Sequence, residues 1–231
     1  MTAIAWLDRP YLLLLGHGLA VTIVLAAVCV TLALALGFAL ALAGRHRWGL
    51  PLTHAYTAAF RNTPLLLQLF FWYFGAMALL PEAARVWLNS PHALWPTPET
   101  LAATLGLTLY TAAYFAEDIR AGLRGVPAGQ WEAALAIGLR PAQAFRFVVL
   151  PQALRISAPA LIGQIMNAVK NSSLTMAIGM AELSYTSRQV ESATFKTFQA
   201  FGFATLGYVL LIVLIETGWQ IWRRQRPVWT R

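Results

Sequence analysis

Charged residues are scarce in this sequence. Only 11% of its 231 residues are Asp, Glu, Lys or Arg, and 58% are hydrophobic, whereas about a quarter of a soluble domain is charged. Cysteine is almost absent: Cys29 stands alone in an apolar run, which excludes an internal disulfide and a cysteine-based metal site. We expect Cys29 to be a small core residue. The composition is typical of a chain with several membrane spans.

Signatures of catalysis and of nucleotide binding are also missing. The chain has no G-x-S-x-G, H-E-x-x-H or Walker A motif, so we expect no catalytic residue, no metal site and no cofactor within it. The formal charge of +8 does not indicate nucleic acid, because the basic residues gather between and after apolar runs. The histidines have no metal-ligand spacing; they are His17, His46, His54 and His92.

Five apolar segments are long enough to cross a bilayer as helices, which takes about 20 residues. The first exceeds the apolar core of a signal peptide and lacks a basic region before it, so we interpret it as a retained span. The fourth is the most polar and must face protein or water. The sequence predicts a single all-α polytopic membrane domain, residues 1–231, with spans at 19–43, 55–80, 101–123, 156–177 and 198–222.

The basic residues indicate which loops face the cytoplasm. Positive charge gathers after the first span, after the third and in the C-terminal tail, and it is sparse on the opposite side. By the positive-inside rule, the N-terminus is predicted outside and the C-terminus in the cytoplasm. The residues counted inside are Arg45, Arg47, Arg120, Arg124, Arg140, Arg146, Arg155, Arg223, Arg224, Arg226 and Arg231; those outside are Arg9, Arg85, Arg188 and Lys196.

The predicted cytoplasmic loop, 124–155, contains a short amphipathic stretch. Pro127 suits a helix start, Gly138 can adopt the left-handed conformation that ends a helix, and Pro141 suits the first turn of another. We therefore expect two short helices that meet at a sharp bend. They could simply connect spans three and four at the membrane surface, or they could form a docking surface for a cytoplasmic partner. The second helix carries polar residues among apolar ones, namely Arg140, Gln143 and Arg146.

Four motifs resemble those of one transporter family. Glu132-Ala133-Ala134, followed by Gly138 and then by Pro151-Gln152-Ala153, is similar to the EAA loop of ATP-binding-cassette (ABC) importer permeases. Three other stretches resemble permeases for polar amino acids, the histidine, glutamine, glutamate, arginine and opine group, with those for glutamate and aspartate nearest. They are FRNTPLL at 60–66, AYFAEDIRAG at 113–122 and VKNSSL at 169–174. The resemblance covers roughly residues 10–222.

The resemblance implies a type I ABC importer permease in a bacterial cytoplasmic (inner) membrane, paired with a second permease as a homodimer or heterodimer. Two ABC ATPase subunits would bind ATP and Mg²⁺, and an extracytoplasmic binding protein would deliver the amino acid. The alternative is an ATP-independent carrier or channel. Such proteins are expected to contain inverted repeats, and an odd number of spans does not indicate inverted repeats. The implied ATPase-coupling residues are Glu132, Ala133, Ala134, Gly138, Leu139, Arg140, Gln143, Phe145 and Arg146.

Polar residues inside the fourth span are candidates for the substrate path. Gln164, Asn167 and Asn171 fall within an arc of about 60° on a helical wheel, with Lys170 beside them. Lys170 could hold a substrate carboxylate, reach the outer interface or pair with a partner permease. The predicted path residues are Gln164, Asn167, Lys170, Asn171, Ser172 and Ser173.

Four residues in the second and third spans are candidates for structural or gating roles. We expect Arg61 to extend toward the cytoplasmic surface and Pro64 to kink its helix. Glu117 and Asp118 are expected to pair with arginines of the adjoining loop. The Pro- and Trp-rich segment 81–98 is expected to lie on the outer face.

Overall fold

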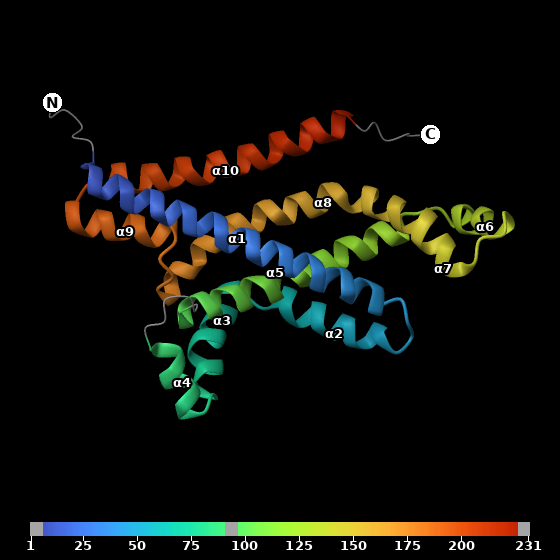
Figure 1. Cartoon of the computed structure of the whole chain (residues 1–231), viewed down its shortest axis with the longest axis horizontal. Helices are drawn as coiled ribbons and strands as arrows, with labels where there is room; N and C mark the ends of the chain where they lie inside the picture. The colour runs from blue at the N-terminus through green and yellow to red at the C-terminus, as the bar shows by residue number, and fades with distance from the viewer. Residues whose placement is uncertain (1–6, 91–96, 226–231) are drawn as a thin grey trace. The chain divides into compact units, whose positions relative to one another are not determined.

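The computed structural model describes residues 7–90 and 97–225 (Figure 1). Every regular element in these two ranges is a helix, so the all-α prediction is confirmed. Residues 91–96, which include His92, and the basic tail residues Arg226 and Arg231 lie outside the described residues. The α-helices are α1 Arg9–Ala43, α2 Gly49–Asn62, α3 Leu65–Phe70, α4 Glu82–Asn89, α5 Pro98–Arg124, α6 Ala128–Ala136, α7 Pro141–Ala144, α8 Leu150–Asn171, α9 Leu183–Thr194 and α10 Thr197–Gln225; the π-helical turns are η1 Phe71–Ala76 and η2 Phe145–Val149, and η3 Ser172–Ile178 is a 3₁₀-helix.

Three of the described helical segments are long and apolar enough to cross a membrane. They are Arg9–Ala43, Pro141–Ile178 and Thr197–Gln225, and they contain the predicted spans one, four and five. Predicted span three lies within α5, whose 27 residues do not meet the same criterion. Five spans therefore stay a prediction.

Predicted span two is broken rather than kinked. α2 ends at Asn62, and Thr63 (φ −105°, ψ 131°) and Pro64 (φ −57°, ψ 133°) are extended before α3 begins at Leu65. The proline ring disfavours the helical conformation of the residue before it, so the helix stops at that point. Pro64 then stands directly before the new helix, a position where its missing N–H costs nothing.

The chain folds into two compact units. Unit 1 comprises Met1–Val30, Pro64–Leu107 and Met166–Arg231, and unit 2 comprises Thr31–Thr63 and Thr108–Ile165. The core of unit 1 includes Leu15 of α1, Val190 of α9 and Ala200 of α10, all fully buried. Apolar side chains from three helices thus hold this unit together.

Unit 2 is packed around the C-terminal half of α5. Phe115 and Ile119 are fully buried, and the Tyr56 hydroxyl of α2 donates to the Leu109 carbonyl oxygen at 2.7 Å. α5 approaches α8 closely at Gly122, where an added Cβ would lie 2.4 Å from the Ala153 carbonyl oxygen. Only glycine permits this approach.

Candidate functional site

The segment that resembles the EAA loop contains a sharp bend. α6 ends in a Schellman motif, in which Gly138 has φ +88°. Its N–H donates to the Leu135 carbonyl oxygen at 2.9 Å, and the Leu139 N–H donates to that of Ala134 at 3.2 Å. Pro141 begins the next helix. The predicted left-handed glycine and bend are confirmed.

The helix after the bend is much longer than predicted. α7, η2, α8 and η3 form one helical segment, Pro141–Ile178, of 38 residues, so the expectation of a second short helix is wrong. No glycine occurs between Pro141 and Gly163. The prolines at 151 and 159 each remove one backbone N–H donor from the helix. A π-helical turn just before Pro151 adjusts the backbone hydrogen bonding without ending the helix.

Most predicted coupling residues lie on the surface around this bend. Gln143 accepts a hydrogen bond from the Arg140 N–H at 2.9 Å, which fixes the start of α7. Ala134 is buried and faces inward, whereas Phe145 is half-buried with its ring centroid 3.6 Å from the Arg45 guanidinium. Leu139 is also half-buried; the exposed residues are Glu132, Ala133, Gly138, Arg140, Gln143 and Arg146.

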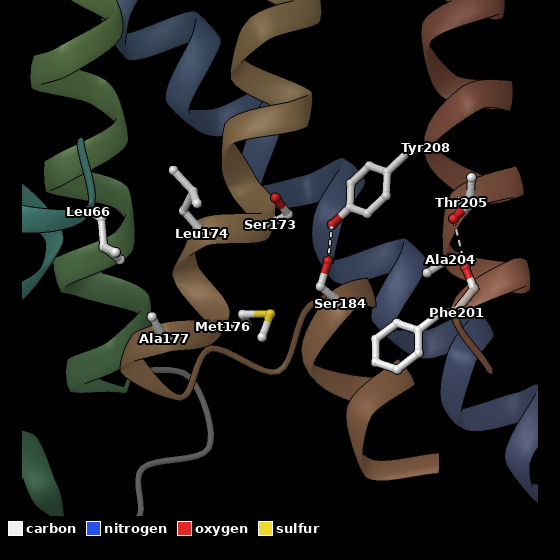
Figure 2. A pocket seen from close by; sticks show the side chains of 10 residues that line it. All are labelled: Leu66, Ser173, Leu174, Met176, Ala177, Ser184, Phe201, Ala204, Thr205 and Tyr208. Atoms are coloured by element: carbon white, nitrogen blue, oxygen red, sulfur yellow. Dashed lines mark hydrogen bonds between the residues drawn. The ribbon is translucent and has the colours of Figure 1, made fainter. Parts of the chain in front are cut away.

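Unit 1 contains a cavity of about 460 Å³ (Figure 2). Leu66 of α3 reaches the cavity with the end of its side chain. Side chains of η3 form one wall of the cavity, and side chains of α9 and α10 form the opposite wall. The wall is mainly apolar, and its polar groups are the hydroxyls of Ser173, Ser184, Thr205 and Tyr208. Among the predicted path residues, Ser173 lines this cavity. The remaining lining residues are Leu174, Met176, Ala177, Phe201 and Ala204.

A buried carboxylate lies directly behind the hydroxyl wall of the cavity. Glu182 is fully buried, and its Oε2 accepts from the Tyr208 hydroxyl at 2.5 Å and from the Thr22 hydroxyl at 3.4 Å. Its Oε1 accepts from the Tyr185 N–H at 3.0 Å, so Glu182 caps α9. Because Tyr208 gives its only proton to Glu182, the Ser184 hydroxyl donates to the Tyr208 oxygen at 3.0 Å.

Burial raises the pKa of Glu182, against the opposing effect of these hydrogen bonds. Sequence reasoning missed both Glu182 and Tyr208. The sequence does contain a signal for Glu182, because it is the one charged residue between Lys170 and Arg188. A charge isolated in an apolar region needs specific partners.

The other polar residues near the end of α8 do not line the cavity. Ser172 is fully buried, and its hydroxyl donates to the Val169 carbonyl oxygen at 2.8 Å. The hydroxyl of Ser173, which does line the cavity, donates to the Lys170 carbonyl oxygen at 2.7 Å. Lys170 is exposed, and Asn171 and Asn167 are half-buried. The polar face predicted for the fourth span therefore coincides only in part with the lining of the cavity.

Gln164 belongs to unit 2, where its side chain is hydrogen-bonded to Asp118. Arg61 is exposed, attracts Asp118 electrostatically and lies with its guanidinium 5.2 Å from the Tyr114 ring centroid. Glu117 pairs with Arg120 at 2.7 Å. These residues form a polar group of their own within unit 2.

Comparisons with known proteins agree with this architecture. A family model described as "Binding-protein-dependent transport system inner membrane component" matches residues 33–223. The probable amino-acid ABC transporter permease protein PatM of Vibrio harveyi is 37% identical over 171 residues, 74% of this chain and 71% of that protein. The glutamate/aspartate import permease protein GltJ of Escherichia coli (strain K12) is 37% identical over 166 residues, 70% of this chain and 67% of that protein.

Solved structures give the same result. The crystal structure of an amino acid ABC transporter with histidines superposes with a TM-score of 0.81 at 28% sequence identity, over 96% of this chain and 100% of that chain. An inward-facing structure of the MetNI methionine ABC transporter gives a TM-score of 0.74 at 23% identity, over 95% of this chain and 99% of that chain. The second likeness concerns the fold alone.

Proposed function

This chain belongs to the family of binding-protein-dependent transport system inner membrane components, and we propose that it forms the translocation path for a small polar amino acid. Its fold is that of type I ABC importer permeases. Two relatives are named for amino-acid and for glutamate/aspartate transport, which supports glutamate and aspartate as the first substrates to test.

The observation that carries the proposal is that the cavity and the bend share one helical segment. Pro141–Ile178 begins at the bend and includes Ser173, Leu174, Met176 and Ala177 of the cavity wall. The lining hydroxyls give their protons to protein groups, so their remaining lone pairs can accept hydrogen bonds from the ammonium of an amino acid. The lining contains no charged side chain, which favours the weak binding that passage requires.

The bend is proposed as the place where the chain contacts an ATPase subunit. Its support is the resemblance to the EAA loop, together with the exposed side chains of Glu132, Arg140, Gln143 and Arg146. We propose two such ATPase subunits, which would bind ATP and Mg²⁺, a second permease and an extracytoplasmic binding protein. The proposed orientation has the N-terminus outside and the bend in the cytoplasm, as the arginine distribution favours.

Selectivity for an anionic amino acid would need a cation close to the path. Lys170 is exposed and lies three residues before Ser173 on the same helix. We propose that it attracts the substrate carboxylate next to the uncharged cavity rather than within it.

Reconstitution tests this function. The chain, with its ATPase and binding-protein partners, is placed in proteoliposomes, and uptake of labelled glutamate, glutamine and arginine is measured with and without ATP. We expect uptake only with ATP and with all partners present. Uptake that persists without ATP and without ATPase subunits would instead indicate an ATP-independent carrier or channel.

A further inference from the structure

Unit 2 contains a small pocket with a strongly basic lining. Its volume is about 220 Å³, several times the ~30 Å³ share of one water molecule. The pocket lies where α1 and α5 end, and half of its lining residues are arginines. The lining consists of Ala41, Gly44, Arg45, Arg120, Leu123 and Arg124.

The positive charge of the pocket is only partly balanced by protein groups. Arg120 pairs with Glu117 at 2.7 Å and lies 2.6 Å from His54 Nε2. Among residues 7–90 and 97–225, the Arg120–Glu117 pair is the only ion pair with a carboxylate. Arg45 and Arg124 therefore contribute positive charge that no carboxylate balances. Partial burial lowers the pKa of Arg45, because desolvation disfavours the charged form of the guanidinium.

Two of the three arginines, Arg45 and Arg120, are held in place before any ligand arrives. Arg120 is nearly buried, and its Nε would lie only 3.6 Å from a Cβ added at Gly44. Arg45 stacks on the Phe145 ring, with 3.6 Å from its guanidinium carbon to the ring centroid. Guanidinium groups fixed in this way form the paired hydrogen bonds that phosphate oxygens accept, at a reduced entropic cost.

The pocket also lies at the end of a helix that can span a membrane. α1 is long and apolar enough to cross a bilayer, and Arg45 follows its last turn, so the pocket is close to the lipid headgroups whichever way the chain is oriented. Trp48 and Leu52, which follow Arg45 within seven residues in the sequence, are 82% and 74% exposed, and such side chains are typical of the interface between membrane and water. Basic pockets between membrane helices bind lipid headgroups.

We propose that this arginine pocket binds the phosphate diester of an anionic phospholipid. Arg45 and Arg124 would contact the phosphate oxygens, and Arg120 would add positive charge from beneath. A ligand-free explanation also exists, because arginines at helix C-termini favourably face the last carbonyl groups. The two explanations differ in whether a lipid is retained and in which arginines retain it.

Binding of defined lipids to the full chain distinguishes them. The purified permease in detergent is titrated with phosphatidylglycerol or phosphatidylcholine, and bound lipid is counted by native mass spectrometry. Arg45→Gln and Arg124→Gln remove pocket contacts, and Arg155→Gln removes an equal charge from an exposed residue outside the pocket. Arg45→Lys keeps the charge but loses the planar donor pair.

We expect each pocket glutamine variant to weaken phosphatidylglycerol binding about 10-fold or more, as loss of charge-assisted hydrogen bonds predicts. Arg45→Lys should give a smaller loss, and Arg155→Gln should change binding by no more than about 5-fold, the effect of general surface charge. Equal losses in pocket variants and in Arg155→Gln, or no preference over phosphatidylcholine, would overturn the proposal. Displacement of the lipid by millimolar inorganic phosphate would assign the pocket to free phosphate instead and would also overturn it. If Arg45→Gln fails to fold, the exposed Arg124→Gln decides alone.

Discussion

Replacement of Gly138 by alanine should weaken the coupling between ATP hydrolysis and uptake. Gly138 has φ +88°, and no heavy atom lies within 4 Å of an added Cβ. A new methyl group would therefore clash with nothing, and the whole cost of the substitution is backbone strain. For a residue with a Cβ in the left-handed region that strain is about 1–2 kcal/mol.

The strain can be relieved only if the bend opens. A change of 1–2 kcal/mol shifts the balance between bent and opened forms by roughly 5- to 30-fold. If the bent form is the one that contacts the ATPase, the number of amino acids moved per ATP should fall by up to that factor. The assay measures amino-acid uptake and phosphate release in the same proteoliposomes. Loss of protein from the membrane lowers both rates and leaves their ratio unchanged, whereas uncoupling lowers the ratio.

Gly129 provides a matched control in the same loop. It lies within α6, has no positive φ, and also has no heavy atom within 4 Å of an added Cβ. Gly129→Ala should leave coupling unchanged and favour the helix by about 0.5–1 kcal/mol. Gly138→Asn should fall between glycine and alanine, because asparagine tolerates the left-handed region better. Unchanged coupling in Gly138→Ala, or an equal loss in Gly129→Ala, would refute the reasoning.

Three other substitutions test separate residues. Glu132→Lys reverses an exposed charge beside the bend, and we expect continued ATP hydrolysis with much reduced uptake; normal uptake would remove Glu132 from the proposed contact surface. Lys170→Met should lower glutamate uptake by roughly 10-fold or more, the cost of a lost charged hydrogen bond, with little effect on glutamine; an equal effect on both substrates would make Lys170 structural. Burial raises the pKa of Glu182 above its ordinary value of 4.5, so the contribution of Glu182 to the free energy of unfolding should be greatest below pH 4.5 and fall as the pH rises through the raised pKa. Glu182→Gln should reduce that fall in thermal unfolding experiments, whereas Glu191→Gln, at a half-buried position on the same helix, should not; parallel curves for all three proteins would contradict the assignment.

Local signals in the sequence were sufficient to predict the bend but not the length of the helix after it. A glycine that can adopt positive φ and a proline in a first turn act within a few residues, so Gly138 and Pro141 could be interpreted without tertiary information. Prolines at 151 and 159 remove backbone donors that a helix normally uses, but the structure retains the helix around both. Whether a proline ends a helix depends on how the released carbonyl is satisfied, and the sequence does not contain that information.

The cavity could be predicted only in part. The helical wheel brought Gln164, Asn167 and Asn171 to one face of α8, yet Ser173 is the predicted path residue that lines the cavity. A wheel gives positions around one helix and does not identify the neighbouring helices. Glu182 and Tyr208 stand 26 positions apart in the sequence, and they meet only because α9 and α10 pack together. No periodicity within either helix indicates that contact.

The close approach at Gly122 restricts how α5 and α8 can move within unit 2. A Cβ there would lie 2.4 Å from the Ala153 carbonyl oxygen and 2.9 Å from Ser157 Cβ. Sliding α5 along α8 by about one turn would bring Asp118 or Ile119, which lie on the same face of α5 as Gly122, to the narrowest point, where a side chain has no room. Translation is therefore blocked, whereas rotation about the crossing keeps glycine at the contact. Gly122 thus acts as a pivot, and relative motion of these two helices should be a change of crossing angle and not a shift in register.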